Sequence, residues 1–283
     1  MLNRRTALLI SLPVASVVLS LLIYASLTNS VRAWVLLSLL GSKYVTVLTS
    51  FLLVVFDPEV ALVAMSCTLT SGCVAVILKF LLKLPRPPPS LWRIKVSGYG
   101  FPSGHATMSS SAYGFVALYL KYPCIVATCG LVMFAVALSR VMLGVHYVRD
   151  VAGGIAIGLG LALLMYYLYE RCRGPVPSLV LAIILGMISY IYSGYGSCIE
   201  AAAVAAGLLT SHVMFKKFYH NVRSALLKTK VLYVLATIFA ILAVLGATHS
   251  YVLSIRTVAH YFCGFLMIAV PCAIASVPQL LHH

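Results

Sequence analysis

Three short blocks of polar residues lie between positions 79 and 150 of a chain that otherwise carries little charge. Their members are Lys79, Arg86, Pro102-Ser103-Gly104-His105, Ser139-Arg140, His146 and Asp150. Arginine offers a planar fork of donors to two oxygens at once, and lysine offers a compact positive charge. Since a charged residue in an apolar chain is costly, such a cluster usually marks a functional site. Cations, histidines and one carboxylate together suit the binding and transfer of a phosphoryl group.

The block at residues 102–105 has the composition of an anion cradle. Ser103 and Gly104 follow Pro102 at the predicted start of a helix, where free backbone N–H groups and the helix dipole favour an anion. Gly104 allows the backbone to approach closely. We expect this turn to stabilise the charge that develops during transfer.

Spacing places the other polar residues on predicted helical faces. Lys79 and Arg86 are seven residues apart and are expected to share a face. Ser139, His146 and Asp150 follow at steps of seven and four, so one face should present all three. A carboxylate one turn beyond His146 can hold one ring nitrogen and leave the other free to attack. Arg140 lies about 100° round that helix, within reach of its long side chain.

In order and spacing, the three blocks resemble those of the type 2 phosphatidic acid phosphatase superfamily, also called the lipid phosphate phosphatases. The resemblance covers about residues 40–170. It implies that His146 is a nucleophile that forms a phosphohistidine, and that Asp150 orients it. It implies that His105 protonates the leaving oxygen and then activates water. The implied phosphate-binding residues are Lys79, Arg86, Ser103, Gly104 and Arg140. Because these cations substitute for a metal, no metal or other cofactor is expected.

Composition indicates a membrane protein. Hydrophobic residues make up 62% of the chain and charged residues 9%. Apolar runs of roughly 17–25 residues recur, and each is long enough to cross a bilayer as a helix. They are continuous rather than alternating, which excludes a transmembrane barrel. We predict an all-α, polytopic membrane protein with a six-helix phosphatase core over residues 1–173. Residues 174–283 are predicted to add about four further transmembrane helices.

Several features locate the individual elements. Arg4-Arg5 and the apolar run after them predict a retained first helix rather than a cleaved signal peptide. Residues 31–41 form either an interfacial helix or an extension of the second span. Gly154, Gly158 and Ala162 repeat every four residues, which predicts a close-packing face. The predicted helices are 7–27, 43–57, 59–82, 103–120, 123–147, 150–170, 176–194, 197–215, 230–247 and 251–279.

The proline run at residues 87–89 should end the third predicted helix. After it, residues 88–102 form a polar loop that we expect to cover the phosphate site. Its Arg93 and Lys95, like Lys83 before it, are expected to contact the membrane surface or lipid headgroups. His212, His220, His249 and His260 have no partners at useful spacing and are expected to be structural.

The formal net charge is +15, from 20 Lys and Arg against 5 Asp and Glu. The cations are scattered at predicted helix ends, which favours a membrane surface and an anionic substrate over nucleic acid. Five cations and no acid in residues 216–230 place that segment in the cytoplasm. The three blocks then face the extracytoplasmic side of a cell membrane. The eight cysteines form no CxxC pair, so neither a zinc site nor a redox motif is indicated.

The lipid substrate is less well defined by the sequence. Residues 99–106 resemble microbial undecaprenyl and dolichyl diphosphate phosphatases, which favours an isoprenoid lipid phosphate or diphosphate. The long C-terminal half resembles the layout of sphingosine-1-phosphate phosphatases and glucose-6-phosphatases. The former usually have Thr where Gly104 stands, and the latter lack an equivalent of Asp150. Sphingosine-1-phosphate-like, phosphatidate-like and sugar phosphate substrates remain alternatives. So do a lipid phosphotransferase and, outside the enzymes, a membrane transporter or channel. The oligomeric state is left open.

Overall fold

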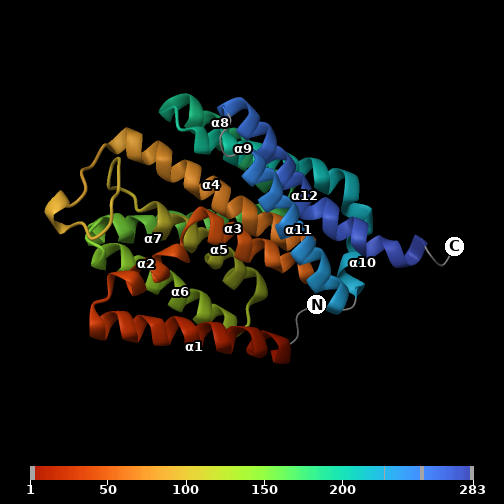
Figure 1. The fold of residues 1–283 in the computed structure, drawn as a ribbon, viewed down its shortest axis with the longest axis horizontal. Coiled ribbons are helices and arrows are strands. Elements are labelled where there is room, and N and C mark those ends of the chain that lie inside the picture. The colour runs from red at the N-terminus through yellow and green to blue at the C-terminus, as the bar shows by residue number, and fades with distance from the viewer. Residues whose placement is uncertain (1–3, 226, 249–251, 281–283) are drawn as a thin grey trace.

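A computed structural model describes residues 4–225, 227–248 and 252–280, and those residues form helices joined by short connections, without strands. The longest helices run roughly side by side, and one long loop projects at an end of the bundle (Figure 1). Within the described residues, seven helices are long and apolar enough to cross a membrane, or eight if one bent pair forms a single span. The predicted all-α, polytopic membrane fold is therefore confirmed.

The N-terminal half contains α1 (Arg4–Thr28), α2 (Val31–Leu39), α3 (Lys43–Phe51) with the 3-10 turn η1 (Leu52–Val55), α4 (Pro58–Leu82), η2 (Pro89–Leu91), α5 (Gly104–Leu120), α6 (Pro123–Met142) and α7 (Val148–Cys172). The C-terminal half contains α8 (Val176–Ser193), α9 (Gly196–Phe215), η3 (Lys216–Phe218), α10 (Tyr219–Ser224), α11 (Leu227–Thr248) and α12 (Leu253–Leu280).

Ten helices were predicted, but they differ in their capacity to span. The candidate spans are α1, α4, α6, α7, α8, α12 and the segment Gly196–Ser224. Residues 31–41 are helical, and α2 joins α3 at a bend of 49° to give the bent pair. α5 has 17 residues, and within α11 only the shorter segment Thr229–Val244 is strongly apolar.

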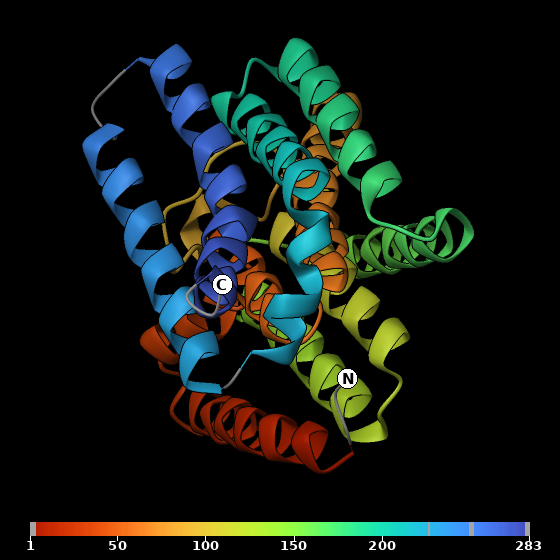
Figure 2. The ribbon, with the colours of Figure 1, turned by 90° about the vertical axis from the view of Figure 1, so that its right-hand side faces the viewer.

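Helix α4 is the central element of the bundle. Its most apolar stretch is 78% buried, compared with 17% for that of α1. It packs against α3, α5 and α8, so the C-terminal helices rest directly on the helix that carries Lys79. Helices α8, α9, α11 and α12 gather on one side of the molecule and α1 lies at the opposite edge (Figure 2). A division between residues 173 and 174 stays a prediction.

The predicted close-packing face of α7 is confirmed, and its partner is α5. A Cβ atom on Gly158 would lie 2.5 Å from the carbonyl oxygen of Thr107, and one on Gly154 would lie 2.9 Å from that of Ser103. Ala162 is fully buried in the same contact region. Small residues thus let the two helices approach closely. The approach brings the first turn of α5 beside the first turn of α7.

Two predicted helix geometries were wrong. The helix predicted over 123–147 ends at Met142, because Gly144 adopts a positive φ of 71° that breaks the helical path. Ser139 and Asp150 therefore lie on different helices, and His146 lies in the turn between them. Likewise α4 ends at Leu82, where Lys83 takes a left-handed conformation with φ 48°. Arg86 lies beyond that end and shares no helical face with Lys79.

Candidate active site

The three polar blocks meet at one end of the bundle. Lys79 lies in the last turn of α4, His105 in the first turn of α5 and Arg140 in the last turn of α6. His146 occupies the α6–α7 turn, and Asp150 lies in the first turn of α7. The loop of residues 83–103, which projects in Figure 1, closes this end.

Arg86 organises the loop and reaches the α6–α7 turn. Its Nε donates to the carbonyl oxygen of Gly98 at 2.9 Å, and Nη2 donates to that of Ser97 at 3.0 Å. Nη1 donates to the carbonyl oxygen of Val145 at 2.9 Å. Burial lowers the pKa of Arg86, while the nearby Asp150 charge acts in the opposite direction. One planar side chain thus ties two separate segments of the site together.

The imidazole of His146 lies between Arg86 and Asp150. Nε2 is 2.9 Å from Arg86 Nη1, and Nδ1 is 3.4 Å from Asp150 Oδ2. Because a guanidinium can only donate, Nε2 is the accepting nitrogen and Nδ1 carries the proton toward the carboxylate. The fully buried Asp150 is held in turn by the backbone N–H of Tyr147, at 3.0 Å from Oδ2. This tautomer places a lone pair on Nε2, as a nucleophile requires.

The electrostatic surroundings keep His146 neutral. Its side chain is only 3% exposed. Burial lowers the pKa of His146 to about 4, assisted by the positive charges of Arg86, Lys79 and Arg140 and opposed by the hydrogen bond to Asp150. At neutral pH the ring is therefore uncharged and its Nε2 lone pair is available.

Lys79 extends from α4 to the end of the same loop. Its Nζ donates to the carbonyl oxygens of Tyr99 and Gly100, at 2.7 and 3.0 Å. Lys79 and Arg86 thus converge through the loop that both of them bind. The sequence correctly grouped the two cations, although it assigned the wrong geometry to them.

The turn at residues 102–105 leaves free backbone donors and open space at the start of α5. The Ser103 N–H donates to the Asp150 carbonyl oxygen at 2.9 Å, and its buried Oγ has no hydrogen-bond partner. A Cβ atom on Gly104 would meet nothing within 4 Å, so the space beside this backbone is open. The first N–H groups of α5, on Gly104 and His105, have no intrahelical acceptor. His105 interacts electrostatically with Arg140, His146, Arg86 and Lys79, which places it among the same cations.

Arg140 is buried and is held by a residue that the sequence analysis missed. Its side-chain Nη1 donates to Ser38 Oγ at 2.7 Å, and its Nε has no hydrogen-bond partner. Ser38 lies near the end of α2, just before the α2–α3 bend. Serine in an apolar helix is too common to reveal such a pairing from sequence. By contrast, Ser139 bonds back to the Val136 carbonyl of its own helix.

The α2–α3 bend also packs directly against His105. A Cβ atom on Gly41 would lie 2.8 Å from the His105 carbonyl oxygen and 2.5 Å from Val136 Cγ1. Only glycine fits at this approach without displacing its neighbours. The segment from Ser38 to Gly41 therefore forms one wall of the site. The sequence carried a weak signal for it, since Gly41-Ser42 is a typical helix boundary.

The loop that covers the site is anchored away from the catalytic groups. Arg93 Nη1 donates to Asn29 Oδ1 and Nη2 donates to the Asn29 carbonyl oxygen, both at 2.7 Å. Trp92 Nε1 donates to the Pro87 carbonyl oxygen at 2.8 Å. Arg93 thus fastens the loop to the α1–α2 junction.

Comparison with known proteins finds a family model and several relatives that match this sequence. The family model described as "PAP2 superfamily" matches residues 60–173. Phosphatidylglycerophosphatase B of Bacillus subtilis is 38% identical over 88 residues, which cover 27% of this chain and 42% of that protein. Decaprenylphosphoryl-5-phosphoribose phosphatase of Mycobacterium tuberculosis is 35% identical over 102 residues, covering 34% and 54%. Human sphingosine-1-phosphate phosphatase 2 is 38% identical over 101 residues, covering 32% and 25%. The chain thus spans about half, or less, of the length of these relatives.

Among solved structures, a transmembrane PAP2-type phosphatidylglycerolphosphate phosphatase from B. subtilis superposes with a TM-score of 0.45 and 23% identity. That match covers 60% of this chain and 98% of the other. The family match at residues 60–173 contains all the catalytic and phosphate-binding residues that the sequence analysis selected. That match identifies residues 60–173 as a segment similar to the PAP2 superfamily.

Proposed function

We propose that this protein hydrolyses the phosphomonoester of a membrane lipid through a phosphohistidine at His146. The observation that carries the proposal is the position of His146 Nε2. It accepts from Arg86 Nη1 at 2.9 Å, while Nδ1 faces Asp150 Oδ2. A phosphate oxygen bound to the same guanidinium would bring its phosphorus next to the Nε2 lone pair.

In the first step, Nε2 attacks phosphorus and the bond from phosphorus to the lipid oxygen breaks. His105 donates a proton to that oxygen, which leaves as a lipid alcohol. Asp150 stabilises the positive charge that the His146 ring acquires. Arg86, Arg140 and Lys79, together with the first N–H groups of α5, neutralise the charge on the transferring phosphoryl oxygens.

In the second step, His105 takes a proton from water, and the water oxygen attacks phosphorus. The bond between phosphorus and Nε2 breaks, and inorganic phosphate leaves. His105 acts as an acid and then as a base, so it returns to its starting state after each cycle. The open space beside Gly104 supports this use of the turn, because it gives phosphate and water room near His105.

An isoprenoid lipid phosphate or diphosphate is the substrate that we favour. One relative is named as a phosphatase of a decaprenylphosphoryl compound, and the residues around His105 resemble isoprenoid diphosphate phosphatases. Other relatives are named for phosphatidylglycerophosphate, lipid A and sphingosine-1-phosphate. All these names refer to phosphorylated lipids, which define the broader substrate class.

We further propose that the site faces the extracytoplasmic side of a cell membrane. The opposite end of the bundle carries a cluster of cations. Lys216, Lys217 and Arg223 lie in η3 and α10, after the long span that begins at Gly196. A cluster of cations after a span favours the cytoplasmic side.

Purified protein in detergent tests the chemistry. Wild type should release inorganic phosphate from a panel of lipid phosphates and should yield an acid-labile, base-stable phosphoenzyme in rapid quench. His146→Ala should form no phosphoenzyme and should lose at least about a thousandfold in rate, because the covalent path is gone. His220→Ala, on the exposed surface of α10, is the matched control. A His146→Ala enzyme within tenfold of wild type would overturn the proposal.

The same preparation tests whether fixed cations suffice. Because Lys79, Arg86 and Arg140 already supply positive charge, turnover should persist in excess EDTA. Vanadate should compete with substrate for the same cations. An enzyme silenced by EDTA and rescued by Mg²⁺ would show instead that a metal carries the charge stabilisation.

A further inference from the structure

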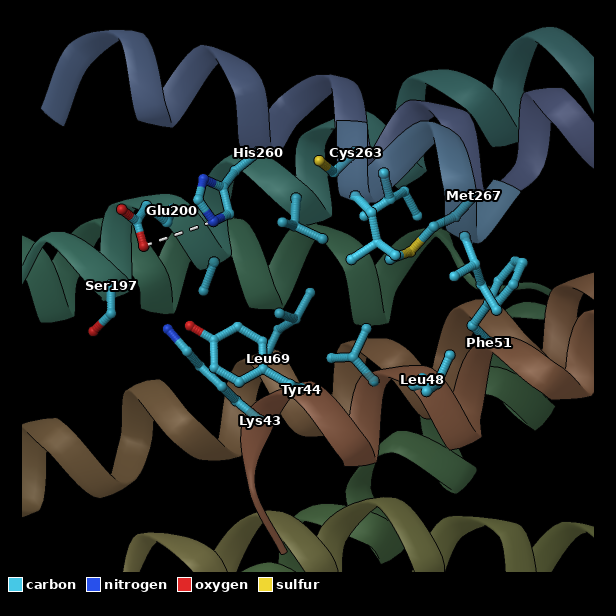
Figure 3. Close-up of a pocket in the computed structure, with 16 residues that line it drawn as sticks. Lys43, Tyr44, Leu48, Phe51, Leu69, Ser197, Glu200, His260, Cys263 and Met267 are labelled. Carbon is cyan, nitrogen blue, oxygen red and sulfur yellow. Dashed lines mark ion pairs between the residues drawn. The ribbon is translucent and has the colours of Figure 1, made fainter. Parts of the chain in front are cut away.

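A pocket lined by none of the residues of the three blocks lies between the N-terminal and the C-terminal helices. It is lined by α3, α4, α9, α11 and α12 and has a volume of about 270 Å³. Apolar side chains line most of it, while Lys43, Glu200 and His260 gather at one end (Figure 3). Since an apolar cavity of roughly 150 Å³ holds one benzene-sized molecule, this one suits part of a single hydrocarbon chain.

The apolar part is elongated. On α3 it extends from Lys43 to Phe51, a distance of roughly 12 Å at the rise of an α-helix. Leu69, Val204 and Met267 line its walls from three other helices. In Figure 3 the polar groups stand at one end of this length and Phe51 at the other. The shape is that of a slot for an extended chain with one polar end.

At the polar end the His260 ring and the Glu200 carboxylate face each other across a gap (Figure 3). His260 Nδ1 is 2.7 Å from the Arg256 carbonyl oxygen, so Nδ1 carries the proton and Nε2 of the neutral ring is an acceptor. That Nε2 faces Glu200 Oε2 across 3.8 Å, too far for a direct hydrogen bond. Glu200 is only 4% exposed, and its other oxygen accepts from Arg256 Nη2. A donor on a third group could hydrogen-bond to either of the facing atoms.

The charges around this gap select the kind of donor. Glu200 is balanced by Arg256, and Lys43 adds a further positive charge at the same end. An ammonium head would meet Lys43, and a phosphate head would meet the buried Glu200 carboxylate, so each faces a like charge. A hydroxyl is neutral and both donates and accepts. Its single O–H can donate to Glu200 or to His260, while its oxygen accepts from Lys43.

We propose that this pocket binds a long-chain lipid alcohol, with its hydroxyl between Glu200, His260 and Lys43. The polar end lies on the catalytic side of the bundle. Lys43 opens α3 two residues after Gly41, which packs on His105. Tyr195, just before α9, packs on Phe80 near the end of α4. Both contacts connect the pocket mouth to elements of the active site.

One consequence rests on the proposed function. Hydrolysis of a lipid phosphate produces a lipid alcohol, so the pocket would distinguish the product of the reaction from its substrate. The alcohol could also come from the bilayer independently of catalysis. The binding chemistry is the same for both sources, and the experiment separates them.

The test uses the full chain in nanodiscs and a hexadecanol analogue with a photoreactive diazirine at the far end of its chain. Crosslinks mapped by mass spectrometry should fall on the apolar lining near Phe51 and Met267. Unlabelled hexadecanol should compete, whereas hexadecyl methyl ether should compete at least tenfold more weakly, as should hexadecyl phosphate in His146→Ala, which cannot hydrolyse it. Crosslinks spread over the outer faces of the spans would overturn the proposal. So would equal competition by the ether, because the hydroxyl would then not be recognised.

Substitutions in the pocket lining, and a control on the exposed side of α9, test the site further. Ala201→Phe fills the slot one residue after Glu200 and should abolish specific labelling, whereas Val213→Phe, on the exposed side of α9, should not. Glu200→Gln should weaken competition by hexadecanol at least fivefold. A folded Ala201→Phe protein, monodisperse in size exclusion, that labels like wild type contradicts the assignment. If a variant does not fold, the wild-type crosslink map and the ether comparison still decide the question.

The source of the alcohol is read from the phosphate competitor. Active protein that is preincubated with hexadecyl phosphate should hydrolyse it to hexadecanol, which then competes effectively. Preincubation with His146→Ala should produce no such competitor. If hexadecyl phosphate remains a weak competitor in both proteins while hexadecanol competes well, the alcohol site stands and the proposed catalytic function fails. If hexadecanol itself does not compete, the alcohol site fails, whatever the catalytic result.

Discussion

Arg86 and His146 are joined by a 2.9 Å hydrogen bond from Nη1 to Nε2, although one follows α4 and the other follows α6. The bond fixes the imidazole tautomer and places a cation at the atom that is to attack. A phosphate can replace Nε2 as the acceptor for that N–H without any movement of the guanidinium anchors at Gly98 and Ser97. Under the proposed function, the residue that would bind substrate is also the one that holds the His146 ring in place before substrate arrives.

Arg86→Lys should therefore lower kcat/KM by roughly 10²–10³, because lysine cannot donate to phosphate, to Val145 and to the loop at once. Steady-state kinetics on a lipid phosphate measure this. Arg93→Lys makes the same chemical change in the same loop, but its partner is Asn29, so its kcat/KM should remain within a few-fold of wild type. Equal losses in the two variants would assign Arg86 a role in loop anchoring alone.

On the acid side of the pH profile, kcat/KM should fall only at an unusually low pH. Only the neutral His146 ring is a nucleophile, and burial together with nearby cations holds the pKa of His146 at about 4 instead of the usual 6.5. The reactive form is therefore lost only as the pH falls through about 4. In Arg86→Gln this fall should move to higher pH, because a positive charge next to the ring is removed. A wild-type fall between pH 6 and 7 would contradict this, with fluorescence used to confirm folding at each pH.

Ser38→Ala should weaken phosphate binding without touching any residue of the three blocks. It leaves the buried Arg140 Nη1 without its partner, at a cost of about 1–3 kcal/mol, so KM should rise roughly tenfold or more while kcat changes less. Ser38→Thr retains the hydroxyl and should restore KM. Ser26→Ala removes a hydroxyl that bonds only within α1, and it should have no effect. An unchanged KM and an unchanged vanadate inhibition constant in Ser38→Ala would remove Ser38 from the site.

His105→Ala should have different effects on two classes of substrate. A lipid alkoxide is a poor leaving group and needs a proton, so the loss of His105 should cost roughly 10²–10⁴ in rate. With an aryl phosphate such as p-nitrophenyl phosphate, the p-nitrophenolate group leaves without protonation. The loss in the rate of phosphoenzyme formation should therefore be much smaller. The measurement is the burst rate for each substrate. Losses of the same size would show that His105 binds phosphate and does not protonate the leaving group.

The sequence predicted which residues lie together at the site better than it predicted the helix ends that position them. The three blocks specify residue types, and each of their chosen residues lies at the same end of the bundle. What spacing could not reveal is that Gly144 ends α6 before His146, since an isolated glycine is also tolerated within a helix. His146 and Asp150 keep their contact because the turn leads straight into α7, where Asp150 falls in the first turn.

The sequence could not predict contacts between residues that are far apart along the chain. Ser38 meets Arg140 across 102 positions, and Glu200 meets His260 across the interface of α9 and α12. Nothing in local periodicity pairs such residues, because helices can pack in many registers. His260 was accordingly expected to be structural, whereas it lies at the polar end of a pocket. Close-packed glycines such as Gly158 were the exception, since their four-residue repeat is itself a packing signal.

Reactivity of two introduced cysteines should establish which face of the membrane carries the site. Ser97 and Ser224 are both exposed, the first in the loop over the site and the second in α10 at the other end of α9. Because Cys172 is exposed and Cys124 is partly so, both should first be changed to serine. In intact cells, a membrane-impermeant maleimide should then modify Ser97→Cys, and it should modify Ser224→Cys only after the membrane is broken. The reverse pattern would place the chemistry in the cytoplasm. Modification of both from outside would mean an even number of crossings between them, as the candidate spans α6, α7, α8 and Gly196–Ser224 give by themselves, whereas opposite faces require the 17-residue α5 to cross as well.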